Sequence, residues 1–300
     1  MATMSGKHPE WLKKKAPSSS ILSQMEALLS GLSLHTVCQS ALCPNMGECF
    51  SRRTATFLIL GDICTRNCRF CAITKGKPSP PDPAEPVNVA RAVNQLKLRH
   101  VVVTSVTRDD LPDGGADHFC RTIDAIRHIN PGTTVEVLIP DFRGSVQALE
   151  SVVNRLPEVI NHNVETVPRL YPSVRSLADY RRSVNLLRTV KSMNQKILTK
   201  SGLMLGLGEQ YREVVAVLED LRAAGCDALT IGQYLSPSPE HHPVLRYVTP
   251  PEFDGYRRLG EEMGFGYIAS GPFVRSSYRA AEMVNTLSRN TISRGLPVTG

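Results

Sequence analysis

Three cysteines stand in one stretch of eight residues, Cys64-Thr-Arg-Asn-Cys68-Arg-Phe-Cys71, which follows the apolar run Thr56-Phe-Leu-Ile-Leu60. An extended chain reaches at most about 3.5 Å per residue, so these short spacers can fold three thiolates around one small inorganic core. A closed structural zinc site takes four protein ligands, whereas iron–sulfur clusters are held by cysteine thiolates. Three thiolates without a close fourth cysteine therefore predict a 4Fe–4S cluster with one iron left open for chemistry. The alternative is a structural metal knot, because short cysteine motifs also bind zinc.

A second group of cysteines, Cys38, Cys43 and Cys49, precedes the first with the spacing Cys-x4-Cys-x5-Cys. A proline, an asparagine and a glycine between them are turn residues that bend the chain back on itself. No fourth cysteine or well-spaced histidine accompanies the three, which weakens the alternative of a structural zinc site. Disulfides belong mainly to small secreted chains, so six cysteines within 34 residues indicate metal ligation. The other two, Cys120 and Cys226, are expected to be small buried hydrophobic side chains.

The chain has 300 residues, a length that suits one large α/β domain or two small ones. No apolar run reaches the roughly 18 residues that span a membrane, and no hydrophobic segment directly follows the basic start, as a secretory signal requires. We therefore expect a cytoplasmic protein with no membrane partner. The net charge of +7 suits either nucleic acid or an acidic protein. Because no nucleic-acid motif is present and only 6% of residues are aromatic, an acidic protein partner is favoured and nucleic acid is not expected.

Strand-like and helical segments alternate from residue 56 onward, and they must position the first cysteine group. The strand-like runs are 56–60, 101–106, 134–139, 159–164, 196–205 and 228–235, and the helical segments are 87–98, 116–129, 145–156, 176–193, 211–224 and 250–263. Six alternating β-α units imply a parallel sheet with right-handed crossovers, and six are fewer than the eight of a complete barrel. We predict an α/β fold, a partial (β/α)6 TIM-type barrel, over residues 56–265. The extension 1–55 carries the second cysteine group and a short helix at 20–32, and the other extension is 266–300.

Active residues of such barrels gather on loops at the carboxyl ends of the strands. The loop after the second predicted strand carries Asp109, Asp110 and Asp113, which can do acid–base work, cap the next helix or pair with Arg108. The glycines of segment 200–209 do not match the dinucleotide or Walker fingerprints. They are instead expected to let the backbone approach a ligand closely.

The spacing Cys-x3-Cys-x2-Cys, with an aromatic residue before the last cysteine, resembles the signature of the radical S-adenosylmethionine (SAM) superfamily. The resemblance implies a three-quarter barrel, an open iron that binds the amino and carboxylate groups of SAM, and a 5′-deoxyadenosyl radical that abstracts hydrogen from substrate. The segment Asn161-His-Asn-Val-Glu165 resembles the part of biotin synthase that binds the SAM ribose, so Asn163 and Glu165 are expected in that role. Arg182 and Lys200 are further candidates for SAM binding, and the partner of the SAM carboxylate stays open.

Both cysteine groups together with Arg275-Ser-Ser-Tyr278 resemble the lipoyl synthase family of this superfamily. The resemblance runs from residue 8 to about residue 283 and includes segments 108–116, 161–166, 200–204 and 232–235. It implies that the second cysteine group holds an auxiliary 4Fe–4S cluster, with Ser277 as the fourth ligand. The implied reaction inserts two sulfur atoms, drawn from that cluster, at carbons 6 and 8 of a protein-bound octanoyl-lysine, with one SAM per hydrogen abstracted. Ser277 then has a catalytic part, because a hard serine oxygen among soft thiolates is the ligand expected to release when an iron leaves.

The same resemblance implies several partners. They are octanoylated lipoyl carrier domains (the glycine cleavage H protein or E2 subunits of 2-oxoacid dehydrogenases), a ferredoxin or flavodoxin as electron donor, and an iron–sulfur cluster carrier. The nearest alternative is another sulfur-inserting enzyme such as biotin synthase, but a serine-completed second cluster argues against it. An electron carrier or scaffold needs neither six β-α units nor an open iron, and a zinc-binding structural protein would give a colourless preparation.

Overall fold

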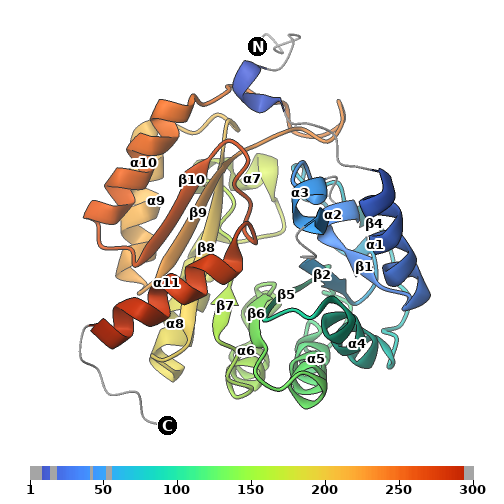
Figure 1. Cartoon of the computed structure of the whole chain (residues 1–300). Coiled ribbons are helices and arrows are strands. Elements are labelled where there is room, and N and C mark those ends of the chain that lie inside the picture. The colour runs from blue at the N-terminus through green and yellow to red at the C-terminus, as the bar shows by residue number, and fades with distance from the viewer. Residues whose placement is uncertain (1–8, 14–18, 41–42, 52–55, 294–300) are drawn as a thin grey trace.

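The computed structural model describes residues 9–13, 19–40, 43–51 and 56–293. Its centre is an eight-stranded sheet in which all neighbouring strands are parallel except for the antiparallel pair β1 and β2 at one edge. In spatial order the strands are β1 (His35–Thr36), β2 (Thr56–Ile59), β5 (His100–Ser105), β6 (Thr134–Leu138), β7 (Val159–Asn161), β8 (Leu198–Leu205), β9 (Ala228–Gln233) and β10 (Tyr267–Gly271). Figure 1 shows the sheet curved into an open barrel, as predicted.

Six helices follow six of the parallel strands and cover the outer side of the sheet (Figure 1). They are α4 (Glu85–Leu96), α5 (Ala116–Ile129), α6 (Val146–Val153), α8 (Tyr180–Met193), α9 (Tyr211–Ala223) and α10 (Pro250–Glu262). Local sequence fixes some of their starts, since Gln210 with Glu213 forms a capping box on α9 and Thr249 with Glu252 forms one on α10. Apolar side chains of these helices pack on strands that are themselves buried, so the barrel wall is one continuous core. The six predicted β-α units are confirmed.

The sheet continues past the six predicted strands and past residue 265, where the barrel was predicted to end. β10 pairs with β9 in parallel, from Tyr267 beside Ala228 to Gly271 beside Gly232. Of its five residues only Ile268 is buried, and no apolar run marks this strand in the sequence. The barrel sheet therefore extends to residue 271.

The amino ends of the strands are covered by α11 (Ala280–Ser293), a helix that the sequence analysis did not predict. Its Met283, Val284 and Leu287 pack with Val159 and Ala228, which are the first residues of β7 and β9. Because this end is closed, a site inside the barrel must open at the carboxyl ends of the strands.

Short elements carry the chain before the barrel: η1 (Glu10–Leu12), α1 (Ser19–Gly31), α2 (Val37–Ser40) and α3 (Met46–Ser51). The predicted helix over 20–32 is confirmed as α1. β1 lies between α1 and α2 and pairs with β2, which ties the second cysteine group to the edge of the barrel. In the part of the chain that the structure describes, no helix is long and apolar enough to cross a membrane.

Candidate active site

One cavity at the carboxyl ends of the strands brings together cysteines of both groups. Its volume is about 550 Å³, and its lining includes Cys64, Cys68 and Cys71 of the barrel loop together with Cys38, Cys43 and Ser277 of the two extensions. Cys49 lies in α3 outside the lining, although its charge acts on Cys38. No three histidine, cysteine or carboxylate side chains among the described residues are gathered tightly enough for a single metal ion. The thiols instead border open space, which suits a cluster better than a closed zinc site.

Burial raises the pKa of three of these cysteine thiols, Cys38, Cys68 and Cys71. Burial raises the pKa of Cys71 to about 12 and also raises that of Cys68, and the charges of neighbouring thiolates add to both increases. Burial likewise raises the pKa of Cys38 to about 12, and charges at Cys43 and Cys49 add to it. With such raised pKa values the deprotonated thiolate form is unfavourable without a counter-charge. A cationic metal core supplies that charge, since a bound metal deprotonates its thiol ligands. The donor set therefore fits iron–sulfur clusters.

The barrel loop that carries the first cysteine group is anchored through Arg66, which is buried. Its Nε and Nη2 donate to both oxygens of Asp109, at 2.7 and 2.9 Å, and Nη2 also donates to Asp141 Oδ1 at 2.6 Å. Burial raises the pKa of Asp141, but the hydrogen bond and charge of Arg66 more than offset it and hold this pKa at about 2. The two-residue strands β3 (Ile63–Cys64) and β4 (Thr74–Lys75) close the loop at its base. The loop is thus fixed to the ends of β5 and β6.

The second cysteine group is joined to the segment between β10 and α11. Asn45 Nδ2 donates to the carbonyl oxygen of Phe273 at 2.6 Å, and Tyr278 Oη donates to Glu48 Oε1 at 3.2 Å. Ser277 Oγ accepts a hydrogen bond from Thr56 Oγ1 at 2.8 Å. The predicted serine ligand is therefore held beside the second cysteine group, although more than 200 residues separate them.

The cavity also contains the polar residues expected at the SAM ribose. Glu165 adopts a left-handed backbone conformation (φ +64°), and its Oε1 accepts a hydrogen bond from Asn163 Nδ2 at 3.0 Å. Burial raises the pKa of Glu165, partly offset by Arg175. Three buried side-chain atoms of residues in the cavity wall lack hydrogen-bond partners: Asn163 Oδ1, Ser105 Oγ and Arg175 Nε. Unsatisfied buried polar atoms are costly, so they fit a polar ligand such as SAM.

The two remaining residues predicted to contact SAM do not line the cavity. Lys200 lies low in the barrel and donates from Nζ to Glu136 Oε1 at 2.9 Å. Arg182 pairs with Asp141 Oδ2 at 3.2 Å. Arg175 is among the arginines that do line the cavity, and it lies in an irregular segment between α7 (Tyr171–Val174) and α8 where no sequence pattern marks it.

The three aspartates of the loop after β5 are engaged in structural contacts. Asp109 binds Arg66, as described above, and Asp110 pairs with Arg108 at 2.8 Å between Oδ2 and Nη2. Asp113 accepts hydrogen bonds from the backbone at the start of α5. Of the three interpretations that the sequence left open, helix capping and ion pairing describe the contacts of these aspartates. Cys120 and Cys226 are buried, as predicted.

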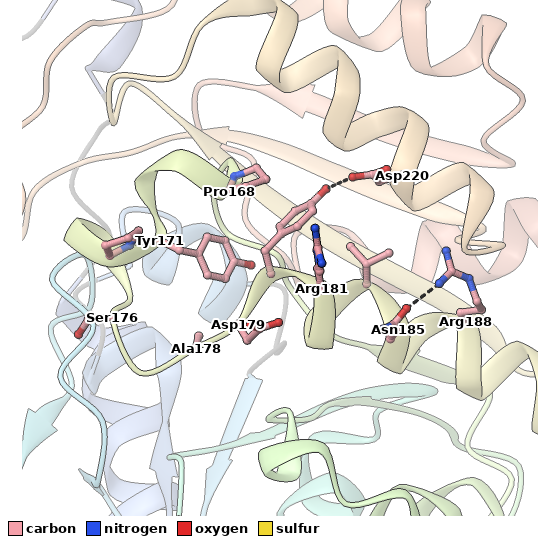
Figure 2. Close-up of a pocket in the computed structure, with 12 residues that line it drawn as sticks. Pro168, Tyr171, Ser176, Ala178, Asp179, Arg181, Asn185, Arg188 and Asp220 are labelled. Carbon is pink, nitrogen blue, oxygen red and sulfur yellow. Dashed lines mark hydrogen bonds between the residues drawn. The ribbon is translucent and has the colours of Figure 1, made fainter.

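A larger hollow of about 830 Å³ lies outside the barrel, between η3 (Pro168–Leu170), α7, α8 and α9. Tyr180 Oη donates a hydrogen bond to Asp220 Oδ2 at 2.7 Å. Arg188 Nη1 donates to Asn185 Oδ1 at 2.6 Å, and Figure 2 shows this pair. No cysteine lines it, and these polar groups satisfy one another. The cavity with the cysteines is therefore the candidate active site.

Comparison with known proteins shows the family to which the chain belongs. Residues 58–232 match the family model "Radical SAM superfamily". The fold resembles HydG, a maturase of the [FeFe]-hydrogenase (TM-score 0.57, 15% identity, 77% of this chain and 54% of that one), and methylornithine synthase (0.53, 13%, 94% and 92%). The chain thus belongs to the radical SAM superfamily.

Its sequence is 60% identical to lipoyl synthase of Caldanaerobacter subterraneus subsp. tengcongensis over 92% of this chain and 97% of the relative. It is 56% identical to lipoyl synthase of Caldicellulosiruptor saccharolyticus over 93% and 98%. The chain belongs to the lipoyl synthase family. It is an enzyme with lipoyl synthase function, and this function implies SAM and two 4Fe–4S clusters as cofactors.

Proposed function

We propose that this enzyme inserts sulfur at carbons 6 and 8 of an octanoyl chain that is amide-linked to a lysine of a lipoyl carrier domain. The observation that supports it best is one cavity lined by the three cysteines of the barrel loop together with Cys38, Cys43 and Ser277. Unactivated C–H bonds have no acidic proton for a general base to remove, so a radical must open them. SAM on the barrel cluster supplies that radical, and the auxiliary cluster supplies the sulfur. A short-lived carbon radical needs its sulfur source in the same enclosed space.

In this proposal Cys64, Cys68 and Cys71 hold the barrel cluster, and Cys38, Cys43, Cys49 and Ser277 hold the auxiliary cluster. Asn163 and Glu165 bind the SAM ribose. Arg175 replaces Arg182 and Lys200 as the cation facing SAM, because it lines the cavity and has an unpartnered buried Nε. Arg66 keeps the barrel loop in place through its two carboxylates.

The proposed partners follow from the reaction. The octanoyl substrate is carried by the glycine cleavage H protein or by E2 subunits of 2-oxoacid dehydrogenases, whose acidic surfaces complement the net charge of +7. A ferredoxin or flavodoxin delivers electrons, an iron–sulfur carrier restores the spent cluster, and the enzyme works in the cytoplasm.

The test is an anaerobic reaction of cluster-reconstituted protein with SAM, dithionite and an octanoyl-lysyl peptide, followed by peptide mass and 5′-deoxyadenosine. We expect a gain of two sulfurs with about two deoxyadenosines per product. Deoxyadenosine without sulfur gain would discard the substrate, and neither product, from protein with both clusters intact, would discard the radical reaction.

The release of Ser277 is tested by Ser277→Cys. A fourth thiolate is a softer, better-matched iron ligand, so the auxiliary cluster should give up iron less readily and sulfur insertion should fall about tenfold or more. Deoxyadenosine formation should continue, because the barrel loop is unchanged. Ser192→Cys on the exposed side of α8 controls for an added thiol. Full sulfur insertion by Ser277→Cys would show that an oxygen ligand is not required.

A further inference from the structure

Arg275 is a half-buried arginine for which the described residues offer no carboxylate at ion-pair distance. It lies in the segment between β10 and α11, and its side chain lines the active-site cavity. Its Nη1 donates a hydrogen bond to the carbonyl oxygen of Val274 at 2.8 Å. The buried arginines Arg66 and Arg108 pair with aspartates, whereas Arg175 donates to backbone carbonyl oxygens. A cation in the cavity wall without a carboxylate beside it favours an anionic partner, which indicates that this partner is a ligand of the cavity.

The fold holds this side chain in place beside the second cysteine group. A Cβ atom at Gly232, in β9, would lie 2.1 Å from the Val274 carbonyl oxygen and 3.3 Å from Arg275 Nη1. Glycine at this position therefore admits the close approach of the segment to the sheet. The hydrogen bonds of Phe273 to Asn45 and of Ser277 to Thr56 fix it on both sides.

Arg275 shares the cavity wall with proposed cluster ligands. Ser277 follows it by two residues, and Cys38 and Cys43 line the same cavity. A 4Fe–4S core with three thiolates and a serine oxygen carries a net negative charge, and a guanidinium offers five N–H donors. The reduction potential of such clusters depends on net charge, hydrogen bonds to sulfur and solvent exposure.

We propose that Arg275 is the cationic partner of the auxiliary cluster, a role that rests on the proposed function. The guanidinium offsets the negative charge of the cluster and donates hydrogen bonds toward its sulfur atoms. A fixed cation stabilises the reduced, more negative state most, so Arg275 raises the midpoint potential. It also slows the loss of iron from a site in which one ligand is an oxygen.

The test measures the auxiliary cluster alone, in the full chain with alanine at all three cysteines of the barrel loop. In this background we compare Arg275, Arg275→Met and Arg275→Lys after anaerobic reconstitution. Iron and sulfide content, the midpoint potential by spectroelectrochemistry and the rate of iron release to a chelator are the readouts. We expect Arg275→Met to have a lower potential and at least fivefold faster iron release, and Arg275→Lys to lie between it and the parent.

The matched control is Arg279→Met, four residues along, whose half-exposed side chain is paired with Glu282. It should leave the potential and the release rate unchanged. Arg275→Met with the parent's potential and release rate would overturn the proposal. Arg275→Met could stay folded by circular dichroism and yet hold no cluster, in which case Arg275→Lys is decisive. A cluster bound by Arg275→Lys would support the charge role, and the absence of a cluster in this variant would overturn it. A parent that binds no auxiliary cluster would instead reject the proposed function, which separates the two failures.

Discussion

Thr56 serves two proposed ligands of the auxiliary cluster at once. Its backbone N–H donates to the Cys38 sulfur and opposes the rise in the pKa of that thiol, while its hydroxyl donates to Ser277 Oγ at 2.8 Å. The hydroxyl is thus a donor to an oxygen that becomes more basic when it binds iron as an alkoxide. At this scale, single hydrogen bonds from the barrel decide where a ligand from the distant tail is placed.

We predict that Thr56→Val weakens the hold on Ser277 without disturbing the strand, since valine keeps the shape and suits a β-strand. A neutral hydrogen bond contributes about 1 kcal/mol, which corresponds to roughly fivefold faster iron release from the auxiliary cluster to a chelator. Thr56→Ser, which keeps the hydroxyl, should behave like the parent. Equal release rates for the valine variant and the parent would show that this bond does not position Ser277.

Gly202 sets the space beside the proposed ribose site. A Cβ atom there would lie 2.7 Å from Asn163 Oδ1 and 2.9 Å from Thr230 Oγ1. Gly202→Ala should therefore displace Asn163 and lower SAM affinity about tenfold, because overpacking typically costs about 1–3 kcal/mol. Equilibrium dialysis measures the SAM affinity. Gly255→Ala in α10, where nothing lies within 4 Å of the added Cβ, is the control, and an equal affinity in both variants would refute the assignment.

At the scale of elements, the barrel loop depends on a salt bridge between three different loops. Arg66 belongs to the cysteine loop, Asp109 follows β5 and Asp141 follows β6. Because Arg66 and Asp141 are both buried, removing one partner leaves an uncompensated buried charge. The ligand loop is therefore coupled to the stability of the barrel.

Arg66→Met should lower the free energy of unfolding by about 3 kcal/mol, the usual loss when a buried ion pair is broken. Urea denaturation of the cluster-free full chain under reducing conditions measures the effect. Arg143→Met changes an exposed arginine of the same loop as Asp141 and should leave the midpoint within error. An unchanged midpoint for Arg66→Met would mean that the loop is held mainly by its backbone.

At the scale of the whole molecule, a buried ion pair lies inside the barrel below the cavity. Burial raises the pKa of Glu136, but the charges of Lys200 and His100 more than offset this increase and hold the pKa at about 2. A carboxyl group whose pKa is lowered by folding stabilises the fold above its unfolded value near 4.5. That contribution is lost as the pH falls from about 4.5 toward 2.

Lys200→Met should therefore destabilise the protein at pH 7 by about 3 kcal/mol, and the difference from the parent should shrink below pH 4.5 as Glu136 becomes protonated. Urea midpoints across pH 3–7 measure it, with Lys200→Met/Glu136→Gln as the charge-free control that regains stability. SAM affinity of the folded variant should match the parent, because Lys200 does not line the cavity. A pH-independent difference would contradict the ion-pair account, and a loss of SAM affinity would restore Lys200 as a contact.

The sequence by itself determined the ligand chemistry and the alternation of strands and helices. The spacing of Cys64, Cys68 and Cys71 is a local property, and the period of apolar residues reports local structure, so both can be read without knowing distant contacts. Asn163 and Glu165 follow strand β7 and line the cavity, and their contact with the SAM ribose stays a prediction. Strand β10 was not predicted, because its five residues form a strand through pairing with β9 rather than through their own hydrophobicity.

Only the tertiary structure decided which cations face the cavity. Lys200 is the third residue of the eight in β8, so its side chain meets Glu136 inside the barrel and not the ligands at the carboxyl end. Arg175 and Arg275 reach the cavity from irregular segments whose path is set by contacts with other parts of the chain. The sequence alone does not show toward which side of the fold a charged side chain points, because this depends on strand register and loop geometry. Register and loop geometry are set by the packing of distant segments.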